Sequence, residues 1–310
     1  MRPKIAIIIV NWNGKDDTMQ CLQSLDSFCS RKGQFGVFVV DNGSSDGSPA
    51  AIREQFGSMQ SHGWRELVLL EQGANLGFAA ANNRGLEAVG DEYNYVYCSN
   101  NDIVFVEDAP GRLADIMERH PDVAVAGPRI LEFADPEKLA HGAGHVRPLL
   151  CGTRSVDAPG PADCDFVTGC ALLIRMTVLR ELDTFIDEDF FAYWEDTDLC
   201  ARVRRKGHRV VYYPETRVLH KVSATTSPGE AGLTSPRRIY YDIHSKCLYA
   251  NKHLGWLART LFLLLFLVRI PVFASQAVLR APRTAVPRVA AYLEGLRDGL
   301  TGRRGKEFAA

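Results

Sequence analysis

The sequence predicts an α/β fold in which a Rossmann-like, mostly parallel sheet is flanked by helices and followed by a C-terminal helical extension. Short apolar runs alternate with helical stretches through the first half of the 310 residues, which is the rhythm of consecutive βαβ units. Polar clusters follow three of these runs, and a basic segment with apolar runs ends the chain. These observations predict one large domain over residues 1–253 and a basic amphipathic helical tail over residues 254–310.

The individual elements follow from their residue patterns. A continuous apolar run predicts a buried strand, and apolar residues three or four positions apart, such as Met19, Leu22 and Leu25, predict a helix. Prolines and glycines between residues 132 and 165 predict irregular or short-hairpin structure, and a second ordered block follows over residues 166–222. In chain order, the predicted elements are a strand at 5–10, a helix at 18–28, a strand at 37–40, a helix near 52–56, a strand at 67–70, a helix at 79–89, a strand at 95–98, a helix at 109–120 and a strand at 123–126.

Charge is unevenly distributed along the chain. The net charge of -1 argues against a nucleic-acid partner. Residues 254–310 nevertheless carry 9 basic and 3 acidic side chains, a balance of +6, which leaves -7 for residues 1–253. A basic tail that also contains Trp256 and the apolar run 261–268 predicts contact with a membrane surface. The alternative is a pair of helices packed on the main domain.

The apolar run of the tail is short for a helix that spans a membrane. It has 8 residues, lies between Arg259 and Arg269, and is followed by Pro271, whereas a spanning helix needs about 20 apolar residues. The N-terminal apolar run lacks a small-residue cleavage site, and the 8 scattered cysteines contain no Cys-x-x-Cys pair. The sequence therefore predicts a cytoplasmic protein.

Polar side chains follow three apolar runs. Asp41 ends the run 37–40 and could accept a hydrogen bond from the imide N–H of uracil or thymine. Asn75 and Gly77 precede a small-residue helix, which allows close backbone approach to a ribose and diphosphate. Asn101 and Asp102 follow the run 95–98, and a carboxylate beside amides suits Mg²⁺ or Mn²⁺. The alternatives are ordinary Asx and glycine turns and an Ala-rich helix start that serves packing.

Further candidate residues lie in the second ordered block. Glu195 and Asp196 follow an aromatic run, where a carboxylate can serve as a general base at a pocket wall. Asp198 could instead be a solvated acid at a helix N-terminus. His220 follows a predicted strand and could be a metal ligand, although a lone histidine is more often structural. The segment from His141 to His145 lacks the glutamate of a zinc-binding helix motif and predicts a loop.

Five segments together closely resemble family 2 glycosyltransferases, especially the bacterial rhamnosyltransferase-like branch. The resemblance covers about residues 4 to 222. The segments are IIVNWNG at 8–14, VVDNGSSDGS at 39–48, NLGFAAANNRG at 75–85, NND at 100–102 and WEDTDL at 194–199.

The resemblance implies a GT-A fold, an inverting mechanism and a nucleotide-diphosphate sugar donor. It also implies roles for individual residues. Asp196 matches the proposed base, with Glu195 beside it, and Asp102 matches the last acidic residue of the family's DxD metal motif. The resemblance assigns the nucleotide to Asn11, Asn13, Asp41, Asn75, Gly77, Asn82 and Asn101, the sugar and acceptor pocket to Thr168, Gly169 and Trp194, and a Mg²⁺ or Mn²⁺ ion to Asp102 and His220.

The chain departs from the DxD pattern, because Asn100 occupies the first acidic position. This departure leaves one protein carboxylate for the metal and puts metal dependence in question. The resemblance favours transfer of rhamnose from dTDP-rhamnose to a hydroxyl of a saccharide or lipid-linked acceptor, by an enzyme at the inner face of the plasma membrane. Alternatives are another UDP-sugar transferase, a nucleotidyltransferase and a non-catalytic nucleotide-sugar-binding scaffold. A nucleotidyltransferase would need a Gly-rich, basic triphosphate loop, and the sequence near residues 5–13 contains none.

Overall fold

The structure is a computed structural model that describes residues 2–28, 33–57, 63–147, 152–221, 235–280 and 282–305. Its elements are β1 (Ile5–Asn11), α1 (Lys15–Phe28), β2 (Phe35–Asp41), α2 (Ser48–Phe56), β3 (Glu66–Glu71), α3 (Phe78–Glu87), β4 (Tyr95–Asn100), β5 (Ile103–Phe105), α4 (Ala109–Arg119), β6 (Val123–Glu132), β7 (Leu139–His141), β8 (Ala143–Arg147), β9 (Gly152–Val156), β10 (Ala162–Asp163), β11 (Ala171–Arg175), α5 (Met176–Leu179), α6 (Glu195–Arg205), β12 (Arg209–His220), α7 (Pro236–His253), α8 (Trp256–Arg280), η3 (Pro282–Thr284) and α9 (Ala285–Leu300).

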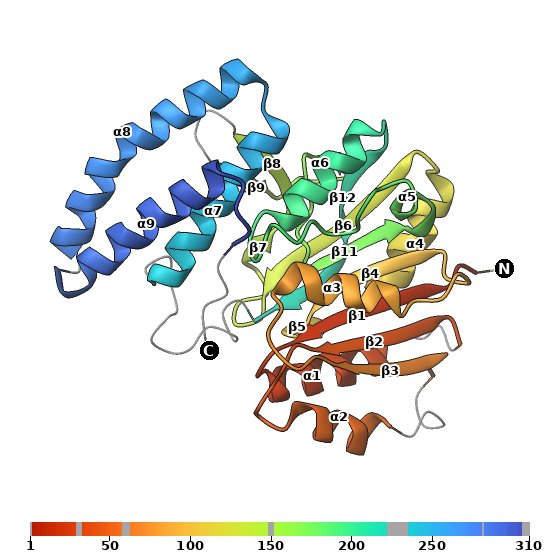
Figure 1. Ribbon diagram of the computed structural model, residues 1–310. Coiled ribbons are helices and arrows are strands. Elements are labelled where there is room, and N and C mark those ends of the chain that lie inside the picture. The colour runs from red at the N-terminus through yellow and green to blue at the C-terminus, as the bar shows by residue number, and fades with distance from the viewer. Residues whose placement is uncertain are drawn as a thin grey trace.

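One large mixed sheet forms the centre of the molecule, with strand order β10-β12-β6-β11-β4-β1-β2-β3 (Figure 1). Strands β1, β2, β3 and β4 are parallel, as the βαβ rhythm predicts. Strand β11 runs antiparallel between β4 and β6, and β5 and β7 pair with β12 and β6. The predicted fold class, a mostly parallel α/β sheet flanked by helices, is confirmed.

Helices cover both faces of the sheet because the strands are apolar on both sides. Alternate residues of β1 enter two separate cores: Ile5, Ile7 and Ile9 pack with α1, α2 and α4, and Ala6 and Ile8 pack with α3 and α6. The segment predicted as irregular or a short hairpin contains the β8–β9 hairpin.

The register of the parallel strands brings their carboxyl ends level. Asn11 at the end of β1 lies opposite Asp41 at the end of β2, and Val10 lies opposite Asn100 at the end of β4. Ser99 pairs with Ala171, so that the turn before β11 joins the same edge. Asp41 also lies opposite Glu71 at the end of β3, four residues before Asn75. The three polar clusters predicted from sequence therefore meet at one edge of the sheet.

The three C-terminal helices form a separate layer beside the sheet, with α8 outermost (Figure 1). Residues of α7, α8 and α9 share one hydrophobic core, to which Phe191 of the main domain contributes. The predicted domain boundary after residue 253 thus falls between α7 and the two helices with which α7 packs, and that boundary stays a prediction.

Helix α8 differs from what its short apolar run suggested. It continues through Pro271 for 25 residues, and residues Trp256–Leu279 are long and apolar enough, by length and composition alone, to cross a membrane. The argument that this segment is too short to span a membrane is therefore wrong, because it counted only the uninterrupted apolar run. Many of the apolar side chains on this helix are exposed, including those of Trp256, Leu267 and Val268.

Candidate active site

The turn after β2 is held by side chains from β1. Asp41 is buried, and its Oδ2 accepts a hydrogen bond from Asn11 Nδ2 at 2.7 Å while its Oδ1 accepts from the backbone N–H of Ser44 at 2.9 Å. Asn13 has a positive φ of 50°, and its Oδ1 accepts from the backbone N–H of Ser45 at 2.8 Å. Asn11, Asn13 and Asp41 therefore first serve to fix the turn that forms this edge of the site.

Asn11 is also the centre of a buried amide network. Its Oδ1 accepts hydrogen bonds from Asn101 Nδ2 at 3.0 Å and Thr18 Oγ1 at 2.8 Å. Asn101 in turn lies within 3.1 Å of Thr18 Oγ1. Because buried amides need partners, this network ties the ends of β1 and β4 to α1 and holds Asn101 at the pocket wall.

The loop before α3 is joined to the end of β2. Asn42 Nδ2 donates to Asn75 Oδ1 at 2.9 Å, and Asn75 Oδ1 also accepts from the backbone N–H of Gly77 at 2.9 Å. Gly77 has φ 87°, and a Cβ there would lie 2.9 Å from the Phe191 backbone oxygen, so only glycine fits. Asn82 does not line the pocket: it is fully buried, and its Nδ2 donates to the Phe78 carbonyl at 2.9 Å.

Asp102 and His220 meet at the same edge of the sheet. His220 ends β12 and pairs with Ile103 of β5, and its Nε2 lies 3.0 Å from Asp102 Oδ1. Both residues are buried, and His220 Nδ1 has no hydrogen-bond partner among the described residues. A buried carboxylate beside an imidazole nitrogen supplies oxygen and nitrogen ligands, so this pair fits a divalent ion that takes its remaining ligands from phosphate oxygens and water.

The acidic segment begins α6 after a strained turn. Tyr193 and Trp194 have φ values of 66° and 69°, a region that costs about 1–3 kcal/mol for such residues and is concentrated at functional sites. The turn brings Asp196 against the segment before β11, where its Oδ2 accepts from the backbone N–H of Gly169 at 2.9 Å. Asp196 remains half-buried, and its Oδ1 accepts from the backbone N–H of Thr197 at 2.6 Å.

Glu195 and Asp196 differ in environment. Glu195 is buried and its Oε2 has no hydrogen-bond partner among the described residues. Burial, and then the negative charge of Asp196, raise the pKa of Glu195 to about 8. Glu195 therefore favours its protonated form at neutral pH.

This shift makes a testable prediction about stability. The pKa of Glu195 rises from 4.5 in the unfolded chain to about 8 in the folded protein. The protonated carboxyl therefore makes its full contribution to the free energy of unfolding below pH 4.5, and that contribution is lost as the pH rises through 8. Between these values Glu195 lowers the free energy of unfolding by about 1.4 kcal/mol per pH unit. Glu195→Gln should remove this slope in chemical denaturation, whereas the same change at exposed Glu54 should not. Equal slopes for both variants and the unaltered protein would contradict the assignment.

The remaining predicted residues are placed as follows. Thr168 Oγ1 lies 3.6 Å from Cys170 Sγ, and the ring of Trp194 lies 5.0 Å from that of Tyr249 on α7. Asp198 is not solvated: it is buried, and it pairs with Arg202 at 2.7 Å and with His253 at 2.6 Å. Burial alone would raise the pKa of Asp198, but these partners outweigh it and lower the pKa. Asp198 therefore joins α6 to α7.

A cavity of about 280 Å³ opens at the strand ends, and part of its wall comes from α7. Arg237 lies over the ring of Trp12 and Arg238 over the ring of Tyr193, each 5.6 Å from the ring centroid. Neither arginine forms an ion pair with a carboxylate within the described ranges. Two such cations beside the N-terminus of α7 form an anion-binding wall. The cavity is lined by Val10, Trp12, Asn42, Asn75, Gly77, Phe78, Asn100, Asn101, Phe191, Ala192, Tyr193, Ser235, Arg237, Arg238 and Tyr241.

The sequence interpretation missed both arginines, although a signal was available. Ser235 caps α7 by accepting from the backbone N–H of Arg238 at 3.2 Å, and Pro236 starts the helix. Cations in the first turn oppose the helix dipole. Two arginines directly after a Ser-Pro helix start therefore indicate an anion that offsets their unfavourable position.

Comparison with known proteins places this geometry in a family. The sequence model described as "Glycosyl transferase family 2" matches residues 6–183. The chain belongs to this family. The predicted family is thereby confirmed, and members of the rhamnosyltransferase-like branch are among its relatives.

Two curated relatives are similar over most of their length. The N-acetylglucosaminyl-diphospho-decaprenol L-rhamnosyltransferase of Mycobacterium tuberculosis is 27% identical over 288 residues, covering 83% of this chain and 87% of the relative. The low-salt glycan biosynthesis hexosyltransferase Agl10 of Haloferax volcanii is 24% identical over 261 residues, covering 81% and 76%. This family 2 chain is therefore a glycosyltransferase with relatives in glycan biosynthesis.

A solved structure confirms the predicted GT-A fold. The mannosyltransferase PcManGT from Pyrobaculum calidifontis, determined with GDP-Man and Mn²⁺, superposes with a TM-score of 0.61 at 15% identity, covering 97% of this chain and 88% of that one. This match therefore includes the region of the three C-terminal helices as well as the sheet.

Proposed function

We propose that this family 2 glycosyltransferase is an inverting enzyme that moves rhamnose from dTDP-rhamnose to a hydroxyl of a saccharide or lipid-linked acceptor. The observation that carries the proposal is the cavity at the strand ends, which is lined by residues of both the sheet domain and α7. It has two arginines on one wall and Asn101 on another, next to Asp102. Asp196 lies close to this wall: a Cβ added at Gly169 would be 3.4 Å from the ring of Phe78, which lines the cavity, and the Gly169 N–H donates a hydrogen bond to Asp196.

The reaction is a single displacement at the anomeric carbon. Asp196 removes the proton from the acceptor hydroxyl while that oxygen attacks, and the bond to the diphosphate oxygen breaks with inversion. Arg237 and Arg238 stabilise the negative charge that develops on the departing diphosphate. A divalent ion, when bound by Asp102 and His220, adds Lewis-acid stabilisation of the same charge.

The donor assignment rests on the similarity to the mycobacterial rhamnosyltransferase and on the base-binding position of Asp41. Asp41 Oδ1 and Oδ2 each accept one hydrogen bond within the protein, and a carboxylate oxygen has lone pairs for a second. Uracil and thymine present the same imide N–H, so a UDP-sugar is the alternative donor.

The proposal is tested with a panel of nucleotide sugars. Calorimetry and diphosphate release are measured for dTDP-rhamnose, UDP-glucose, UDP-galactose, UDP-N-acetylglucosamine and GDP-mannose, with Mg²⁺, with Mn²⁺ and with chelator. We expect dTDP-rhamnose to bind at least about tenfold more tightly than the others, and Arg238→Ala to weaken this binding. Preference for a UDP-sugar would replace the donor, and binding without turnover would favour a non-catalytic scaffold.

A peripheral position at the inner face of the plasma membrane is part of the proposal. Helix α8 is apolar, exposed and bracketed by basic residues, which suits insertion into the surface of an anionic bilayer. Arg269 lies near the middle of the helix, where an arginine costs about 2.5–3.5 kcal/mol at the bilayer centre. This position favours a helix that lies in the interface over one that spans the bilayer.

The membrane contact can be tested by changing two exposed side chains of α8. Leu267 and Val268 are 54% and 68% exposed, so replacing both by Glu should leave the fold intact. Loss of two apolar anchors should reduce binding to phosphatidylglycerol vesicles by about 100-fold or more in co-sedimentation. Phe28→Glu, at an exposed position on α1, is the control. Vesicle binding that is equal in all three proteins would exclude α8 as the contact.

A further inference from the structure

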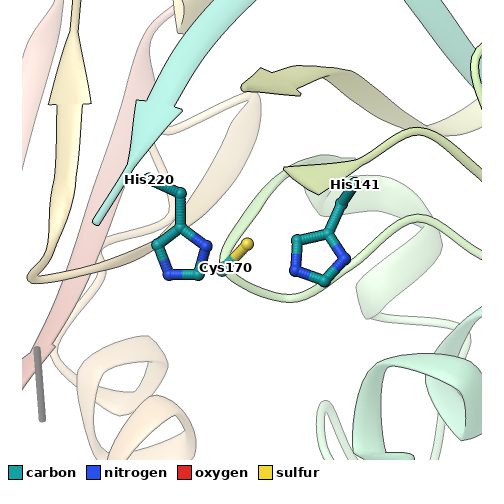
Figure 2. A group of neighbouring side chains, drawn as sticks. All are labelled: His141, Cys170 and His220. Carbon is teal, nitrogen blue, oxygen red and sulfur yellow. The ribbon is translucent and has the colours of Figure 1, made fainter. Parts of the chain in front are cut away.

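Three side chains from distant parts of the chain converge beside Asp102. His141 ends β7, Cys170 precedes β11 and His220 ends β12. Their ligating atoms all lie within 4.8 Å of one another, and the sulfur of Cys170 lies between the two imidazole rings in the view of Figure 2. The His141 and His220 ring centroids are 5.9 Å apart.

We propose that His141, Cys170 and His220 form a binding site for a thiophilic transition-metal ion of the zinc class. One thiolate and two imidazoles are a donor set that zinc prefers and that Mg²⁺ and Mn²⁺ do not. In a tetrahedral zinc site with bonds of about 2.0–2.3 Å, ligand atoms lie about 3.3–3.8 Å apart. The three side chains therefore need to close by only about 1 Å.

The surroundings favour a cation at this position. Cys170 and His220 are buried, and His220 Nδ1 has no hydrogen-bond partner among the residues that the structure describes. The carboxylate of Asp102 lies 3.0 Å from His220 Nε2, so a negative charge borders the cluster. Zinc binds Cys170 as the thiolate, and the thiol proton leaves to solvent. The fourth position remains open for water.

The topology explains why this set is separate from the ion site proposed for catalysis. Strand β6 lies between β12, which carries His220, and β7, which carries His141. Glu132 of β6 lies opposite His220, and Ile130 of β6 lies opposite His141. Asp102 lies on the other side of His220, across the β5 pairing. His220 Nε2 lies 3.0 Å from Asp102 Oδ1, whereas His220 Nδ1 has no hydrogen-bond partner among the described residues. Nδ1 is therefore the ring nitrogen left for the Cys170 cluster, and the two ion sites would share one imidazole through different nitrogens.

This sharing has a consequence for activity, which rests on the proposed function, whereas zinc binding itself does not. Zinc on His220 Nδ1 would place a second positive charge across the same ring from an ion held by Nε2 and Asp102. Because like charges this close repel each other, we expect zinc to weaken Mn²⁺ binding and so to inhibit sugar transfer, and Cys170→Ser to relieve the inhibition.

The binding test uses the full-length protein after treatment with chelator, titrated with Zn²⁺ by calorimetry and with Co²⁺ by absorption spectroscopy. We expect one high-affinity ion per chain and a Co²⁺–thiolate charge-transfer band. Cys170→Ser should abolish the band and weaken Zn²⁺ binding by at least about 100-fold, more than loss of an outer hydrogen-bond partner costs. His141→Gln provides a second, independent ligand change.

Cys164→Ser is the matched control, because Cys164 and Cys170 are both 6% exposed and Cys164 lies outside the cluster. Binding lost in both ligand variants and kept in the control supports the site. Binding that survives in both ligand variants, or absence of the thiolate band in the unaltered protein, overturns it. If zinc binds as expected but no nucleotide sugar is turned over, the metal site stands and the proposed transferase function fails.

Discussion

Asp196→Asn should lower the rate of sugar transfer by about 100-fold to 10,000-fold, because the acceptor hydroxyl loses its general base. Donor binding should change little, since the side chain stays the same size. One hydrogen bond changes: Asp196 accepts from both the Gly169 and Thr197 backbone N–H groups, and an amide offers only one oxygen. The measurement is the transfer rate, together with donor affinity and the midpoint of thermal unfolding.

Asp183→Asn is the control for this experiment, because Asp183 is exposed and precedes the acidic segment that begins α6. Asp196→Asn with donor affinity kept and transfer lost supports Asp196 as the base. An Asp196→Asn protein that retains more than a tenth of the activity would mean that another group accepts the proton. Glu195 would then be the first candidate to test.

Asp102→Asn should lower transfer by about 100-fold to 1,000-fold, because the cation that would stabilise the developing negative charge loses its carboxylate ligand. It should also abolish the increase in donor affinity that Mn²⁺ produces, because His220 alone is left to hold the ion. Calorimetry of the nucleotide diphosphate with and without Mn²⁺ measures the second effect independently of turnover.

A matched variant tests the same site in the opposite direction. Asn100→Asp restores the first acidic residue of the DxD pattern at the end of β4, and a second carboxylate should tighten Mn²⁺ binding. If Asp102→Asn and chelator both leave transfer unchanged, the diphosphate is neutralised by Arg237 and Arg238 without a metal ion.

The position of the site could be predicted from sequence because it depends on connectivity. Parallel strands joined by helices end at one edge of a sheet, so residues that follow such strands meet there whatever their side chains do. Asp41, Asn75 and Asp102 were predicted in this way, and the register of β1, β2, β3 and β4 confirms that these strand ends lie level.

The roles of single side chains were harder to predict, because burial and hydrogen bonding decide them. Asn11 and Asn82 have the same residue type and were assigned the same role from the resemblance. In the structure, Asn11 joins two strand ends to α1, whereas Asn82 lies in α3 and bonds its own helix. Residue type and spacing do not distinguish these outcomes, since packing sets the direction of each side chain.

The sequence by itself determined the α/β fold, the family and the edge of the sheet that carries the polar clusters, because periodicity, strand-end chemistry and motif order are local properties of the chain. Only the tertiary structure brought Arg237 and Arg238 to the far wall of the cavity, and only it joined His141, Cys170 and His220 into one group. These residues lie on separate elements whose meeting depends on antiparallel pairings late in the chain and on the packing of α7. Contacts of this kind are set by the global arrangement of the core, which no local pattern in the sequence specifies.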